Sequence, residues 1–293
     1  MGRGDLTHAE WARLKSHLPK SGKPGGRWAS HRRVINGILY RLRAGVPWRD
    51  LPARFGPWKT VYERHRRWSA EGTWDGIFAA VLADADADGR IDWSMVSVDS
   101  TSCRAHQHAA GARTKPPRVP GKRRTPRQHR PDEGLGRSRG GLTCKIHLAG
   151  EGGRRPLALL ITPGQWGDAP QLIPVMERIR VGRLGGGHPR TRPDHLGGDK
   201  AYSSRRNRRY LRRLQIKHTI PEPKNQRANR QRRGSKGGRP AGFDKTIYKR
   251  RNEVERTINT LKNSRAVATR FDKRGYIFHG TVTVASIRLW LRP

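Results

Sequence analysis

Residues 142–161, LTCKIHLAGEGGRRPLALLI, decide the fold. In the first part of this stretch every second residue is apolar, a period of two that predicts a strand with one buried face. These apolar residues are Leu142, Cys144, Ile146 and Leu148. After the Gly-rich turn at 150–153, residues 157–161 are all apolar, as in a strand buried on both faces. The two strands are predicted to pair as a hairpin.

Elements on either side extend this hairpin into a larger sheet. An earlier strand is expected to end at Asp99, and a later short strand at Asp199. Between them Asp168 is expected to cap a helix that runs to about residue 179, because Pro170 suits the first helical turn. The alternative is that Asp168 is a competing carboxylate of the catalytic site. The predicted order is three strands, then helix, strand, helix, strand and helix. It indicates an α/β fold, a ribonuclease H-like mixed sheet flanked by helices.

The N-terminal ninety residues are predicted to be entirely helical. A capping box at 7–10 begins a first helix, and an apolar stripe predicts a second over 31–44, closed by Gly45. A third helix, over about 58–69, is rich in basic and aromatic residues. Short helices joined by a Gly-containing turn, with the second helix basic, have the outline of a helix-turn-helix. A plain three-helix packing unit with a solvated basic face is the alternative.

This pattern divides the chain into two expected domains. A small all-α, helix-turn-helix-like DNA-binding domain is expected over residues 1–90, and the ribonuclease H-like domain over 91–293. Basic loops are expected at about 113–140 and 221–242. The candidate DNA contacts of the first domain are Lys59, Arg64, Arg66 and Arg67.

Charge points to the partner. The chain has 63 Lys and Arg against 23 Asp and Glu, a formal net charge of +40. A body with that surplus repels itself and favours a polyanionic partner, first of all nucleic acid. The longest apolar stretch, 77–83, is far shorter than the roughly 20 residues of a membrane span. We therefore expect no membrane partner and a cytoplasmic, nucleoid-associated protein.

Several other classes of site lack their sequence signals. The two cysteines, Cys103 and Cys144, form no Cys-x-x-Cys pair, so neither a thiolate zinc site nor a disulfide scaffold is indicated. The sequence has no Gly-x4-Gly-Lys-Ser/Thr loop, and we expect no nucleotide cofactor. Carboxylates are scarce in so basic a chain, and those placed at strand ends are therefore informative.

A long helix expected over about 243–263 offers a third carboxylate. At roughly 100° per residue, four of its residues fall within about 60° of arc, next to an apolar stripe; they are Tyr248, Arg251, Glu255 and Lys262. Glu255 lies at the border of the packed face, whereas Glu253 is roughly 160° away and should face solvent. If this helix supplies a catalytic carboxylate, it is Glu255.

The same four residues reproduce the Tyr-x2-Arg-x3-Glu-x6-Lys signature of the insertion sequence 4 and 5 type transposases. The segments 98–101 (VDST) and 198–202 (GDKAY) resemble the family's blocks around its first and second Asp. The segment 46–52 (VPWRDLP) is similar to its DNA-binding region. Over roughly residues 30–291 the chain resembles the DDE transposases of the insertion sequence 5 family.

This resemblance implies a catalytic triad, Asp99, Asp199 and Glu255, that binds two Mg²⁺ (or Mn²⁺) ions, with Asp99 as the shared ligand. It implies cleavage at the ends of an insertion sequence and transfer of the freed 3′-hydroxyl to target DNA. The partners would be double-stranded DNA, both the terminal inverted repeats and the target, and a second copy of the chain. Further DNA contacts would be Tyr248, Arg251, Lys262 and Lys200.

Two other classes of protein remain open on sequence grounds. A structure-specific nuclease of the same fold would share the acidic triad but would never join strands. A non-catalytic basic nucleic-acid-binding protein would have no reason to place Asp99, Asp199 and Glu255 on core elements. Fold analogy alone does not separate these readings.

Overall fold

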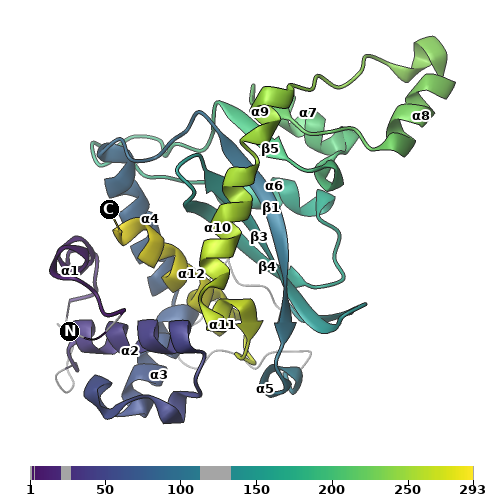
Figure 1. The fold of residues 1–293 in the computed structure, drawn as a ribbon. Coiled ribbons are helices and arrows are strands. Elements are labelled where there is room, and N and C mark those ends of the chain that lie inside the picture. The colour runs from purple at the N-terminus through teal and green to yellow at the C-terminus, as the bar shows by residue number, and fades with distance from the viewer. Residues whose placement is uncertain (1, 3, 21–27, 113–132, 293) are drawn as a thin grey trace.

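The computed structural model of the chain describes residues 2, 4–20, 28–112 and 133–292. Within these residues seven strands form one mixed sheet in the order β2-β3-β1-β5-β6, with β4 paired to β3 and β7 to β1 (Figure 1). The strands are β1 (Val96–Ala105), β2 (Gly136–Ser138), β3 (Gly141–Glu151), β4 (Pro156–Pro163), β5 (His195–Gly198), β6 (Lys217–Thr219) and β7 (Thr269–Arg270).

The hairpin predicted from the alternating pattern is confirmed as β3 and β4, which pair antiparallel from Cys144 with Pro163 to Gly150 with Pro156. β1 runs antiparallel to β3, while β5 is parallel to β1 and β6 is parallel to β5. Three antiparallel strands extended by two parallel ones make the mixed sheet of a ribonuclease H-like fold. The predicted fold class is therefore confirmed.

The N-terminal region is helical, as predicted. It contains α1 (His8–Lys15), α2 (His31–Ala44), α3 (Trp58–Ala70), α4 (Thr73–Ala87) and the 3₁₀ turns η1 (Trp48–Asp50) and η2 (Ala53–Phe55). The Thr7 side chain and Glu10 form the expected capping box at the start of α1. Gly45 ends α2 in the left-handed conformation, with φ of 68°, which a residue without Cβ adopts at little cost.

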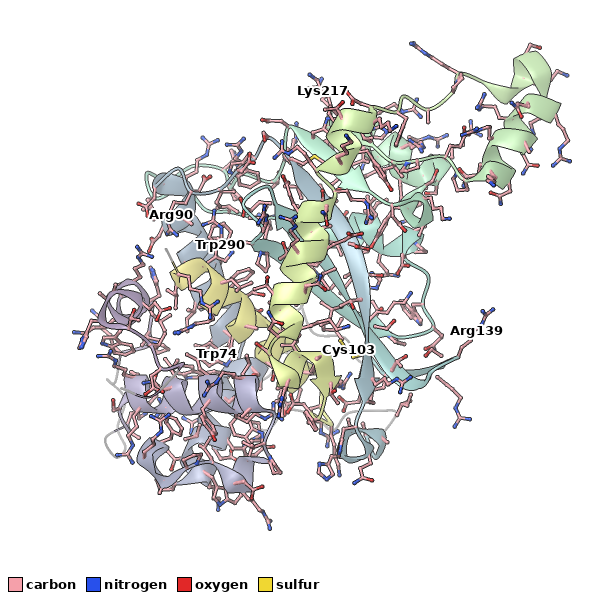
Figure 2. All side chains as sticks on the ribbon, in the orientation of Figure 1. Trp74, Arg90, Cys103, Arg139, Lys217 and Trp290 are labelled. Carbon is pink, nitrogen blue, oxygen red and sulfur yellow. The ribbon has the colours of Figure 1, made fainter. Side chains whose placement is uncertain are left out.

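The C-terminal helix α12 (Gly275–Leu291) joins the two regions of the chain. It packs against α3 and α4 on one side and against β4 on the other. Trp74 of α4 and Trp290 of α12, both marked in Figure 2, are fully buried. Buried residues from the helical region and from the sheet form one continuous hydrophobic core. The expected boundary near residue 90 thus separates two regions that share a core.

The remaining helices are α5 (Gln107–Ala110), α6 (Leu172–Met176), α7 (Arg205–Arg213), α8 (Lys224–Arg232), α9 (Lys245–Lys249), α10 (Asn252–Lys262) and α11 (Arg265–Ala268). The 3₁₀ turns are η3 (Ala169–Gln171), η4 (Lys200–Tyr202) and η5 (Gly234–Gly237). α10 lies across one face of the sheet, over β1 and β3, whereas α8 projects from the body of the molecule (Figure 1).

Three predicted segments differ in the structure. The single helix expected over 243–263 is two helices, because the amides of Arg250 and Arg251 bond to carbonyls three residues back instead of four. The loop expected at 221–242 contains α8, whose residues are all at least partly exposed. It was not recognisable as a helix because it has no apolar stripe. Of the loop expected at 113–140, residues 113–132 lie outside the described residues, and β2 follows them.

None of the helices in the described part of the chain is both long and apolar enough to cross a membrane.

Candidate active site

Asp99 lies in the middle of β1, not at its end as predicted. β1 continues to Ala105 because β3 pairs with it as far as Arg104. Its parallel partner β5, however, stops at the pair Val98–Gly198. Asp99 is therefore the first residue of β1 beyond that pairing, and its side chain is 21% exposed.

Asp199 directly follows β5, where it was predicted. Because Val98 pairs with Gly198, Asp99 and Asp199 each come one residue after the same paired position on neighbouring parallel strands. The Asp199 carboxylate accepts the amide proton of Ala201 at 2.8 Å and so caps η4. The sheet thereby brings together two carboxylates that lie a hundred residues apart in the sequence.

Glu255 comes from the first turn of α10, which packs on β1 and β3 through the buried Val254 and Ile258. Its side chain is 42% exposed and forms an ion pair with Arg251. Glu253 instead pairs with Arg250, and its side chain is 21% exposed, so it is less open to solvent than predicted. The two glutamates have different ion-pair partners, as their predicted angular separation required.

The pKa of Asp99 is affected by the charges of the other two carboxylates, Asp199 and Glu255. Its pKa is raised to about 6: burial is the largest cause, and the nearby charges of Asp199 and Glu255 also raise it, against the lowering effects of the Ser100 amide and Arg251. Arg251 is the cation of this site, since its Nη1 lies 3.5 Å from Oδ2 of Asp99 and its other terminal nitrogen bonds Glu255.

The donor set suits a hard divalent cation, because it is made of carboxylate oxygens. Among the described residues no three His, Cys, Asp or Glu side chains are close enough together to hold a metal ion. Arg251 pairs with two of the three candidate ligands. The Arg251 guanidinium therefore lies between the Asp99 and Glu255 carboxylates and balances part of their charge.

The other residues of the predicted signature lie near this site in different ways. Lys262, on the last turn of α10, donates from Nζ to the hydroxyl of Thr101 on β1 at 3.0 Å. Tyr248 lies on α9, with the Arg251 guanidinium 5.6 Å from its ring centre. Lys200, next to Asp199, is exposed. The break between α9 and α10 thus separates Tyr248 from the helix that carries Glu255.

The N-terminal candidates divide into exposed and buried residues. Lys59 and Arg67 are exposed on α3, and Arg66 is paired with Glu63. Arg64 is only 7% exposed, and its guanidinium stacks over Trp28 and Trp68. Arg64 therefore belongs to the packing of the helical region and does not present its charge to DNA in this structure.

The structure adds contacts that sequence reasoning missed. Asp168 stands at the N-cap position of η3, as predicted, but its side chain makes no capping hydrogen bond. Its carboxylate instead accepts from the Ser100 hydroxyl at 2.8 Å and from Lys145 Nζ at 3.0 Å. Tyr202 is fully buried, and burial together with Asp168, Asp99 and Asp199 raises its pKa well above the ordinary value. The only available signal was that Ser100 and Tyr202 stand in the same short blocks as Asp99 and Asp199.

The strand order defines the class as ribonuclease H-like, and sequence comparison gives the family. Residues 94–278 match the family described as "Transposase DDE domain", and residues 6–78 match "Putative transposase of IS4/5 family". The chain belongs to the DDE transposases of the IS4/5 type. DDE transposase domains act with divalent metal ions on DNA.

Three individual relatives are similar to parts of the chain, and two of them are named as putative transposases. The chain is 33% identical over 136 residues to "Putative transposase for insertion sequence element IS402" of Burkholderia cepacia, covering 46% of this chain and 56% of that one. It is 28% identical over 152 residues to "Putative transposase for insertion sequence element IS6501" of Brucella ovis, covering 52% of this chain and 100% of that one. An uncharacterized protein of Sinorhizobium fredii, y4sN, is 40% identical over 110 residues, 37% of this chain and 82% of that one.

Among solved structures, the Mos1 mariner paired end complex with Mn matches at 11% identity, with 87% of this chain and 86% of that one covered. Its TM-score is 0.26, so the fold assignment depends on the strand order and not on this match.

Proposed function

We propose that the chain cleaves phosphodiester bonds at the ends of an insertion sequence and joins the freed 3′-hydroxyl to target DNA. The observation that carries the proposal is geometric: Asp99 and Asp199 each follow the paired residues Val98 and Gly198, and Arg251 pairs with both Asp99 and Glu255. Carboxylates from β1, from the end of β5 and from α10 share one electrostatic environment. A purely structural role would not require three acidic side chains from separate elements to lie near one another, because their like charges repel.

Asp99, Asp199 and Glu255 would hold two Mg²⁺ or Mn²⁺ ions, with Asp99 shared between them. Such ions supply an activated oxygen nucleophile and stabilise the leaving oxygen of an in-line displacement. In the first reaction water cleaves a phosphodiester and leaves a 3′-hydroxyl. In the second that hydroxyl attacks a target phosphorus, and the 3′-oxygen of the target strand leaves. Both displacements use the same groups, so one site suffices.

The cations around the triad have a role in the same reaction. Arg251 and Lys262 reach the site from the α9–α10 segment, and Lys200 is exposed beside Asp199. We propose that these side chains, with Tyr248, contact the phosphates of bound DNA. On α3, Lys59, Arg66 and Arg67 would contact the duplex further from the reacting bond.

The partners follow from the reaction. Terminal inverted repeats and target DNA would both be bound, and pairing of two ends would require two copies of the chain. With a net charge of +40 the chain should remain bound to DNA at ordinary salt, and so to the nucleoid. Light scattering of the protein with and without a duplex bearing the element's end tests the dimer.

The first test is cleavage and joining in Mg²⁺ and, separately, in Mn²⁺, with DNA that carries the element's own ends. Glu255→Ala is compared with Glu253→Ala, a glutamate two residues away on the same helix that pairs with Arg250. Nicked and joined products that disappear only with Glu255→Ala support the proposal. Nicking without joining favours a nuclease of the same fold. DNA binding without cleavage in either metal leaves a binding protein, and the triad assignment then fails.

A further inference from the structure

A fourth carboxylate, Asp168, is built into the sheet next to the candidate triad. It lies between β4 and α6, and its side chain is 22% exposed. Oδ1 accepts from the Ser100 hydroxyl at 2.8 Å and from Lys145 Nζ at 3.0 Å. Lys145 is also fixed by the carbonyl of Trp166 at 2.9 Å. The ammonium of Lys145 thus forms an ion pair with the half-buried Asp168 carboxylate.

Ser100 belongs to the part of β1 that has the fewest strand neighbours. On one side β1 is paired with β3 from Val96 to Arg104. On the other side, in the described part of the chain, β5 pairs only as far as Val98, and β7 begins at Arg104. On that side residues 99–103 therefore have no strand partner. The hydrogen bond from Ser100 to Asp168 connects this part of β1 to the segment before α6, and it is called the anchor below.

The anchor acts on Asp99 from the opposite face of the sheet. Successive side chains of a strand point to opposite faces. Asp99 and Thr101 contact Arg251 and Lys262 of the α9–α10 segment, whereas Ser100, between them, contacts Asp168. The amide of Ser100 also donates to Oδ1 of Asp99 at 2.8 Å. One residue thus connects the Asp168 carboxylate to the Asp99 carboxylate.

We propose that Asp168 is a positioning residue of the active site: through Ser100 it fixes the backbone that orients the Asp99 carboxylate for metal binding. The inference rests on the proposed function, in which Asp99 is a metal ligand. Removal of such a supporting partner typically costs about 10–100-fold in metal affinity or activity. Asp168 would not itself touch the metal or the DNA.

The test measures binding of Mn²⁺ alone to the full chain, from the decrease of the free-ion electron paramagnetic resonance signal. Asp168→Ala removes the acceptor, and it is expected to weaken Mn²⁺ binding about 10–100-fold. Asp168→Asn keeps an acceptor oxygen for the Ser100 hydroxyl, so its affinity for Mn²⁺ should fall much less. Ser100→Ala should resemble Asp168→Ala, and the double variant should be no worse than either single one, since the two residues act in series. Asp194→Ala, with a side chain 71% exposed, is the control.

Each result decides between possibilities. Unchanged Mn²⁺ affinity in Asp168→Ala, or losses that multiply in the double variant, would overturn the positioning role. A loss in Asp168→Asn as large as in Asp168→Ala would also overturn it, because the charge itself would then be the ligand. If Asp168→Ala fails to fold, as judged by thermal melting, Ser100→Ala carries the test. Asp99→Asn separates the two proposals: if it binds Mn²⁺ normally, the triad assignment fails first.

Discussion

The guanidinium of Arg251 lies against the carboxylate of Asp99, with 3.5 Å between Nη1 and Oδ2. The same side chain also pairs with Glu255, four residues along the chain. An arginine therefore neutralises two residues that would have to release it before they could bind metal. DNA phosphates, which arginine binds readily, are the natural competitor for this guanidinium. Binding of DNA and binding of metal at this site are expected to support each other.

The first prediction concerns Arg251→Gln. Without the competing cation, Asp99 and Glu255 should bind Mn²⁺ about tenfold more tightly in the absence of DNA, since a hydrogen bond to a charged group contributes roughly 1.5–3 kcal/mol. Cleavage of DNA should nevertheless fall, because a phosphate contact is lost. Mn²⁺ titration of the DNA-free protein measures the first effect, and Arg250→Gln is the neighbouring control. Equal or weaker Mn²⁺ binding by Arg251→Gln would refute the competition.

A second prediction concerns stability and pH in the metal-free protein. The pKa of Asp99, about 6 in the folded chain, lies above its ordinary value of 3.8. The folded state therefore holds this proton more tightly than the unfolded state, and the associated stability is lost as pH rises from about 4 to about 6. Asp99→Asn removes that loss. We therefore compare the free energy of unfolding of Asp99→Asn with that of the parent at each pH. This difference should shift in favour of the variant by on the order of 2–3 kcal/mol between pH 4 and pH 8.

Urea unfolding in EDTA at pH 4 and pH 8 measures this difference, with Asp194→Asn as the matched exposed control. The buried position of Asp99, with 21% of its side chain exposed, leaves little screening by solvent. If the free energies of unfolding of the parent and Asp99→Asn differed by the same amount at both pH values, the pKa of Asp99 would not be raised in the folded chain.

Local patterns predicted most of the elements, because their causes are local. The alternation in β3, the capping box before α1 and Gly45 after α2 each depend on residues within a few positions. The role of Asp168 could not be predicted in this way. An Asp before Ala-Pro has the sequence of a helix cap, and only the tertiary structure places Ser100, 68 residues away, within hydrogen-bonding distance. The helix break at Arg250 depends likewise on backbone geometry that periodicity does not reveal.

The third prediction concerns Lys262. Its ammonium bonds the Thr101 hydroxyl at 3.0 Å, so it is held beside the site before DNA arrives. Lys262→Met keeps most of the aliphatic side chain but removes the charge. DNA affinity should fall for all sequences, and the slope of log affinity against log salt should decrease by about one. Thr101→Val, which removes only the bonding partner of Lys262, should leave that slope unchanged. An unaltered slope in Lys262→Met would exclude a phosphate contact.

The last prediction separates two arginines of α3 that the sequence did not distinguish. Arg64 is 7% exposed, stacks over Trp28 and Trp68, and its Nη1 lies 2.8 Å from His31. Arg67, three residues later, is exposed. Arg64→Ala should lower the free energy of unfolding by roughly 1–3 kcal/mol, through lost cation–π and packing contacts.

Arg67→Ala should change stability by less than about 0.5 kcal/mol but reduce the salt slope of DNA binding by about one. The two variants carry the same change of charge, so long-range attraction to DNA is altered equally. Any difference between their salt slopes must then come from local phosphate contacts. Melting temperatures and salt titrations of both variants make the comparison. Arg64→Ala could instead lower the salt slope as much as Arg67→Ala with no loss of stability. Arg64 would then have to leave its stacked position over Trp28 and Trp68 when DNA binds.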